Sequence, residues 1–133
     1  MKSRMLMLLL VFSFLCLGVS DVKAETQVVL QSEILYGSDI GIDQNHIVGS
    51  SYTAWQNQGI TTKGSVTGTL YIFTNGRWVA SQSKTLTGRG RNDGLSVFLD
   101  GYSSGSWYYE GGEHTGSFWT STKYSSSGTL QCP

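Results

Sequence analysis

Hydrophobic and polar residues alternate with a period of two over several short runs of the chain. No window of eleven residues beyond residue 24 has the i, i+3, i+4, i+7 apolar spacing of an amphipathic helix. Gly, Asn, Asp and Ser interrupt the runs about every eight to twelve residues. This pattern predicts an all-β fold, a single antiparallel β-sandwich or a small barrel of about seven to eight short strands.

The strongest local signal is a β-hairpin over residues 65–86 with its turn at Asn75-Gly76. A two-residue type I′ turn needs φ > 0 at both central positions, which Asn and Gly tolerate. The turn would pair Phe73 with Trp78 and Tyr71 with Ala80. One predicted face is aliphatic, with Val66, Leu70, Ile72 and Val79. The other carries Tyr71, Phe73 and Trp78 and becomes polar at Thr67, Thr69, Gln82 and Lys84.

Weaker signals place the remaining strands. We expect strands over 27–36, 46–55 and 95–100, with loops over 37–45, 56–64 and 101–105, and a turn at 92–94. Gly111-Gly112 predicts a second hairpin that joins a strand over 106–110 to one over 114–123. The last residues, 125–133, would form at most a short edge strand.

The first 24 residues resemble a signal peptide in their layout. Lys2 and Arg4 precede an apolar stretch over 5–18, and Val22 and Ala24 suit cleavage before Glu25. The apolar stretch is too short to span a bilayer comfortably, so we favour cleavage over an uncleaved anchor. The sequence therefore predicts a secreted, extracellular protein with no stable membrane anchor after cleavage, whose residues 25–133 form one all-β domain.

Charge excludes some partners of this domain. Residues 25–133 hold six basic and eight acidic side chains, a net charge of about −2. No basic stripe or polybasic segment is present, so binding to nucleic acid or to anionic lipid through phosphates is not expected.

Cys132 is the only cysteine after residue 24. It cannot form an intrachain disulfide within the domain, and one cysteine cannot build a cysteine metal site. Two interpretations stay open: a free thiol on a frayed C-terminus, or a disulfide that links two copies into a dimer.

The predicted ligand-binding residues are aromatic. Flat rings on a rigid sheet, flanked by hydroxyl and amide side chains, suit a sugar, because the ring faces pack on C–H groups while polar side chains bond the hydroxyls. The alternative is that these rings fill the core, as aromatic strand residues often do. The residues are Tyr71, Phe73, Trp78, Trp107, Tyr109 and Trp119.

The favoured function is that of a secreted, non-catalytic protein that binds a glycan or a cell-envelope polymer. A secreted toxin or inhibitor that binds a protein target is one alternative. A small hydrolase or nuclease that uses His114 and Glu110 is another, and it would need both groups to converge with an arginine in one cleft. No nucleophile elbow, phosphate loop or zinc-protease motif is present, so no catalytic residue and no cofactor are predicted.

Two loops offer weaker hypotheses. Oxygen ligands at Asp39, Asp43 and Asn45 could hold calcium, although an ordinary Asx-rich turn is the better interpretation and no metal site is predicted. Arg89 and Arg91 could clamp a carboxylate or phosphate, although a solvated turn with Asp93 paired to one arginine is the simpler interpretation.

Overall fold

The computed structural model describes residues 27–31, 34–56, 61–117 and 119–133, and the predicted signal peptide lies outside these residues. The described part of the chain is all β, with no helix. Its strands are β1 (Gln27–Gln31), β2 (Ile34–Asp43), β3 (His46–Gln56), β4 (Thr62–Thr74), β5 (Arg77–Gly90), β6 (Asn92–Gly101), β7 (Trp107–Gly116), β8 (Lys123–Ser126) and β9 (Leu130–Gln131).

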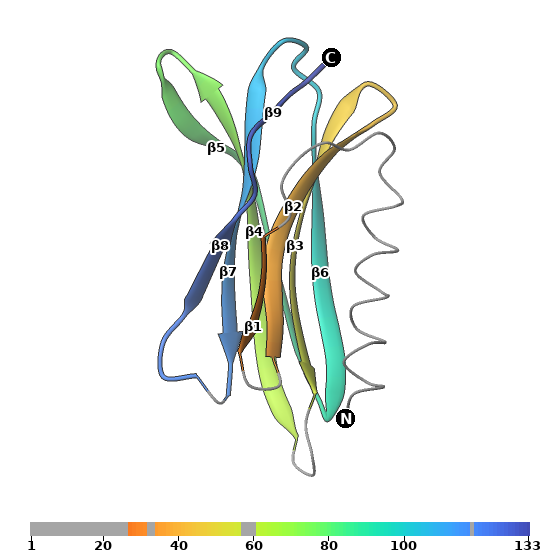
Figure 1. The fold of residues 1–133 in the computed structure, drawn as a ribbon, viewed down its shortest axis with the longest axis vertical. Helices are drawn as coiled ribbons and strands as arrows, with labels where there is room; N and C mark the ends of the chain where they lie inside the picture. The colour runs from red at the N-terminus through yellow and green to blue at the C-terminus, as the bar shows by residue number, and fades with distance from the viewer. Residues whose placement is uncertain (1–26, 32–33, 57–60, 118) are drawn as a thin grey trace.

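The strands form two antiparallel sheets that pack face to face (Figure 1). The four-stranded sheet has the order β1-β2-β3-β6. The five-stranded sheet has the order β5-β4-β7-β8, and β9 also pairs with β7. The chain crosses from the second sheet to the first at Arg91, between β5 and β6. The predicted all-β fold is confirmed, and the two layers correspond to a sandwich.

The hairpin at Asn75-Gly76 is confirmed, with Phe73 opposite Trp78 and Tyr71 opposite Ala80. Asn75 and Gly76 have φ values of 52° and 77°, as a type I′ turn requires. The register then shifts at a β-bulge between the Leu70 and Tyr71 pairs.

Because of the bulge, the predicted positions of Gln82 and Lys84 on the aromatic face are wrong. Because an extra residue reverses the side-chain alternation of β5, Ser83 and Thr85 bond Thr69 and Thr67 on the outer face. Gln82 therefore does not continue the aromatic face, and its side-chain amide donates to the Asp100 carbonyl of the other sheet. Lys84 is likewise on the face opposite to the one predicted.

The N-terminal strand predictions were wrong in their limits. A hairpin pairs β1 with β2, from Gln31 opposite Ile34 to Gln27 opposite Ser38, where one strand over 27–36 was expected. The expected loop over 37–45 is mostly strand, and only Gln44 and Asn45 form a turn, both with positive φ. The predicted turn at 92–94 lies within β6, where Gly94 donates to its neighbour Asp93. The Gly, Asp and Asn residues of these two segments wrongly predicted a loop and a turn. Both segments are strands because pairing with β3 satisfies their backbone groups.

Gly111-Gly112 does not form a turn. Both glycines lie in the middle of β7, and neighbouring side chains explain why no larger residue stands there. A Cβ on Gly111 would lie 3.0 Å from the Tyr71 ring, and one on Gly112 would lie 2.6 Å from His114 Nε2. These glycines therefore mark close approaches of side chains to the backbone. The chain instead turns after Gly116, and the C-terminal residues return as β8 and β9 beside β7.

The interior between the sheets changes character along its length. The residues of β3 that point inward are, in order, Ile47, Gly49, Ser51, Thr53 and Trp55. The end nearest Ile47 is apolar and contains Ile40, Ile47, Leu70, Leu99, Tyr108 and Cys132. At the opposite end the buried Trp55 donates its indole N–H to the Gly90 carbonyl at 2.9 Å. Polar side chains fill the space between these two ends.

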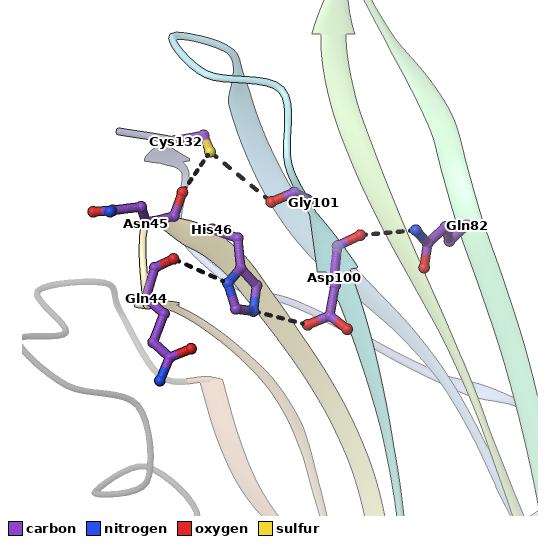
Figure 2. Close-up of polar contacts among 7 residues, drawn as sticks. All are labelled: Gln44, Asn45, His46, Gln82, Asp100, Gly101 and Cys132. Carbon is purple, nitrogen blue, oxygen red and sulfur yellow. Dashed lines mark hydrogen bonds and ion pairs between the residues drawn. The ribbon is translucent and has the colours of Figure 1, made fainter.

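The C-terminus is packed into the apolar end, so the predicted frayed tail is wrong. Cys132 is only 2% exposed, and Figure 2 shows its thiol between the carbonyls of Asn45 and Gly101, at 3.7 and 3.9 Å. Backbone bonds hold the segment, since Cys132 donates to Ser106 and Gly105 donates to Cys132. A disulfide to a second copy would first have to expose this thiol, so its burial favours the free thiol over the disulfide-linked dimer.

Candidate functional site

An aromatic cluster lies on the outer face of the five-stranded sheet, at the end that carries the Asn75-Gly76 turn. The rings of Tyr71 and Tyr109 stack with centroids 4.6 Å apart and planes within 11°. Trp78 packs edge-on against Tyr109 at 4.8 Å, and Phe73 packs edge-on against Trp78 at 5.2 Å. Phe73 is 43% exposed and Trp78 37%. We call these four residues the ring cluster.

The other two predicted site residues are placed differently. Trp107 is exposed and lies two residues before Tyr109 on the same side of β7, so it extends this face. Trp119 lies elsewhere, half-buried, edge-on to Tyr36 at 5.3 Å with the Lys123 ammonium 5.9 Å from its ring. The structure therefore brings four predicted rings together, places a fifth on the same face and separates the sixth.

Rows of hydroxyl groups continue this face away from the ring cluster. Cross-strand pairs join Thr69 to Ser83 at 3.1 Å and Thr67 to Thr85 at 2.7 Å. Ser65 bonds Thr115 of β7 in the same way. These residues alternate with the buried positions of β4, so their hydroxyls lie on the outer surface.

A second polar site lies inside the sandwich, where Glu110 and His114 are both fully buried. Both side chains point inward from β7 because they occupy positions of the same parity. Three serines link them in a continuous chain, with 2.6 Å from Glu110 Oε2 to Ser51, 2.9 Å from Ser51 to Ser38, 2.7 Å from Ser38 to Ser125 and 2.7 Å from Ser125 to His114 Nε2. On its other side His114 Nδ1 lies 2.8 Å from Thr53, whose hydroxyl donates to the Ser65 carbonyl at 2.9 Å. We call this chain the interior network.

Counting hydrogens fixes how many protons Glu110 and His114 hold between them in the interior network. It contains six short contacts, and its four hydroxyl groups supply four hydrogens. The other two must come from Glu110 and His114 together. A neutral pair meets this count if protonated Glu110 donates to Ser51, each serine donates to the next, Ser125 donates to His114 Nε2, and His114 Nδ1 donates to Thr53. An ion pair meets the same count with the serine chain reversed, so that His114 Nε2 donates to Ser125 and Ser51 donates to Glu110. Every contact then holds one hydrogen.

Burial selects this neutral arrangement over an ion pair. Burial raises the pKa of Glu110 to about 8, an effect that the hydrogen bond from Ser51 only partly offsets. Burial lowers the pKa of His114 to about 4. The remaining oxygen of Glu110, Oε1, is buried without a hydrogen-bond partner in the described part of the chain. A neutral carbonyl oxygen tolerates that position at far lower cost than a carboxylate oxygen would.

The interior network does not have the geometry expected of the hydrolase alternative. Glu110 and His114 are enclosed between the sheets, and the side-chain hydrogen bonds of the interior network join them to serine and threonine hydroxyls, not to an arginine. Sequence reasoning missed the network because it interrupted the strand at Gly111-Gly112. An unbroken strand over 107–116 would have placed Tyr108, Glu110, Gly112 and His114 on one face.

The remaining sequence hypotheses concern the apolar end. His46 Nε2 contacts the Asp100 carboxylate (Figure 2), at a distance of 3.4 Å, and the His46 ring stacks on the exposed Tyr102 at 4.9 Å. Asp39 and Asp43 are four residues apart on an extended strand, about 13 Å, which is too far to share one calcium ion. Within the described ranges, no group of three or more His, Cys, Asp or Glu side chains is placed to hold a metal.

Comparison with known proteins adds no functional assignment. No family model matches the chain, and no curated protein and no solved structure matches it at a significant level. Over the residues that the structure describes, no helix is long and apolar enough to cross a membrane.

Proposed function

We propose that this protein is secreted and binds a glycan on the outer face of its five-stranded sheet, without catalysis. The observation that carries the proposal is the ring cluster beside the rows of hydroxyl groups on one continuous sheet face.

The ring cluster offers apolar contact of a fixed shape. Tyr71 and Tyr109 stack face to face beside Gly111, whose missing side chain leaves room for the edge of the Tyr71 ring. Trp78 and Phe73 stay exposed although each contacts another ring. Rings held by their neighbours lose little conformational entropy when a ligand packs on them. Sugar C–H groups match such a surface.

The hydroxyl rows offer neutral hydrogen bonds. Threonine and serine hydroxyls both donate and accept, as sugar hydroxyls do. Thr67, Thr69, Ser83 and Thr85 are already ordered in cross-strand pairs. Burial, and secondarily Tyr71, raise the pKa of Tyr109, so its phenol also stays a donor at neutral pH. A protein partner would instead favour a larger apolar core at this surface.

Sedimentation with insoluble polysaccharides and purified cell walls tests the proposal. We expect the protein, expressed from its full-length sequence, to be retained by at least one polymer. Trp78→Ala should weaken retention roughly tenfold or more, because it removes a large apolar contact. Phe98→Ala is the control, since Phe98 is an aromatic residue of comparable exposure, 44% against 37% for Trp78, on the other sheet.

Two results would contradict the proposal. One is that no polymer retains the protein, which would favour the alternative of a toxin or inhibitor that binds a protein target. The other is that Trp78→Ala and Phe98→Ala weaken retention equally while both variants keep the parent's unfolding temperature.

A further inference from the structure

A pocket of about 680 Å³ lies at the end of the five-stranded sheet away from the ring cluster. It opens where β4 begins and β5 and β7 end, and Ser65, Thr87 and Thr115 contribute hydroxyl groups to its lining. Lys63 and Arg89 supply two positive charges to the same lining.

The two cations are neighbours by register. Lys63 lies directly opposite Arg89 on β4 and β5, so their side chains leave the same face of the sheet. Like charges directly opposite each other destabilise a sheet unless something neutralises them. In the described part of the chain neither side chain forms an ion pair with a carboxylate. Glu113 lies further along β7, opposite Thr67, and Asp93 lies beneath Gly88 and Gly90.

The rim of the pocket is held in place by hydrogen bonds. The Ser117 hydroxyl accepts from the Lys63 backbone N–H at 2.8 Å and donates to the Lys63 carbonyl at 3.1 Å. The Ser117 backbone N–H donates to the same carbonyl at 2.9 Å. The pocket therefore combines positioned hydroxyls with two cations that form no ion pair among the described residues, the chemistry that binds an oxyanion.

We infer that the glycan bound by this sheet is acidic and that the pocket at Lys63 and Arg89 binds one of its negatively charged substituents. The inference rests on the proposed function and adds the class of ligand. Lys63 and Tyr71 are eight residues apart on β4, about 26 Å along the strand. A ligand that reaches both the pocket and the ring cluster must therefore be an extended chain. The substituent can be a carboxylate or a sulfate, which share this chemistry.

Affinity electrophoresis with two matched polymer pairs tests the inference and separates the two substituents. The pairs are polygalacturonate with its methyl ester, and dextran sulfate with dextran. We expect the full-length protein to prefer the acidic member of at least one pair. The double variant Lys63→Ala/Arg89→Ala should lose that preference by roughly tenfold or more, because each charged hydrogen bond contributes substantially to binding.

Lys84→Ala is the control variant, since it removes one exposed positive charge from β5 on the face away from the pocket. Three results would overturn the inference: no acidic preference in the parent protein, an unchanged preference in the double variant, or an equal loss in Lys84→Ala. The variant Trp78→Ala tests the proposed role of the ring cluster independently of the pocket. If it leaves binding unchanged while the double variant loses the acidic preference, the pocket stands and the proposed role of the ring cluster fails.

Discussion

Glu110 and His114 show how burial acts on single residues. The same desolvation raises the pKa of the acid and lowers the pKa of the base, because each charged form loses its water. Their neutral forms then complete the chain of hydrogen bonds through Ser51, Ser38 and Ser125. We expect this chain to stabilise the register between the sheets, since its members come from β2, β3, β7 and β8.

The two pKa shifts have opposite effects on stability as pH changes. The folded pKa of Glu110, about 8, exceeds its ordinary value of 4.5, so its stabilising contribution is complete below pH 4.5 and is lost as pH rises toward 8. The folded pKa of His114, about 4, is below its ordinary 6.5, so its contribution is complete above pH 6.5 and is lost as pH falls toward 4. Between pH 4.5 and 6.5 the two slopes cancel.

Glu110→Gln tests this assignment. The glutamine amide can donate to Ser51 as the protonated acid does, but it cannot ionise. Relative to the parent, the variant should gain roughly 1.4 kcal/mol of unfolding free energy per pH unit between pH 5.5 and 8. Urea denaturation across this interval measures the difference. Glu113→Gln, which changes the exposed neighbouring acid, should follow the parent, and parallel curves for Glu110→Gln would refute the neutral network.

At the scale of elements, the sequence predicted the features that depend on local chemistry. Asn75-Gly76 specifies its turn through two φ values, so the hairpin and its aromatic pairing were predictable. The bulge between the Leu70 and Tyr71 pairs was not predictable, because nothing in the local pattern marks it, and it moves Gln82 to the other face. The turn predicted at Gly111-Gly112 was wrong, because the role of these glycines depends on side chains that distant strands place against them.

Gly112→Ala tests the role of close approach in β7. The added methyl group would lie 2.6 Å from both His114 Nε2 and the Ser38 hydroxyl, so hydrogen bonds of the interior network must break. We expect a loss of at least about 2 kcal/mol in unfolding free energy, measured by thermal or urea denaturation. Gly94→Ala is the control, since its methyl group would meet only Ala54 at 3.6 Å. Equal, small effects of both substitutions would contradict the assignment.

At the scale of the whole molecule, the side chains between the sheets differ in chemistry from those on the outer face of the five-stranded sheet. Apolar and neutral polar side chains fill the space between the sheets, while aromatic and hydroxyl groups cover the outer face of one sheet. The sequence predicted that Tyr71, Phe73 and Trp78 share one face because a single hairpin carries them, but it did not place Tyr109 of β7 beside them. Trp119 could not be separated from them in advance, because the turn after Gly116 sends it to Tyr36.

The buried C-terminus provides a test of the packing of the whole molecule. Cys132 lies within the apolar cluster, so a bulky maleimide should label it slowly in the native protein and completely in denaturant. Mass spectrometry of the labelled peptide measures the extent of reaction. Complete labelling within minutes under native conditions, or a disulfide-linked dimer on a non-reducing gel, would contradict the burial of this thiol.

The indole N–H resonances of the four tryptophans test the central claim most directly. Each of Trp55, Trp78, Trp107 and Trp119 gives one signal in an NMR spectrum of the ¹⁵N-labelled protein, and each lies in a different environment. On addition of a soluble oligosaccharide cut from a retained polymer, we predict shifts of Trp78 and Trp107 while Trp55 and Trp119 stay in place. Shifts confined to Trp119, or to neither Trp78 nor Trp107, would show that the outer face of the five-stranded sheet is not the binding site.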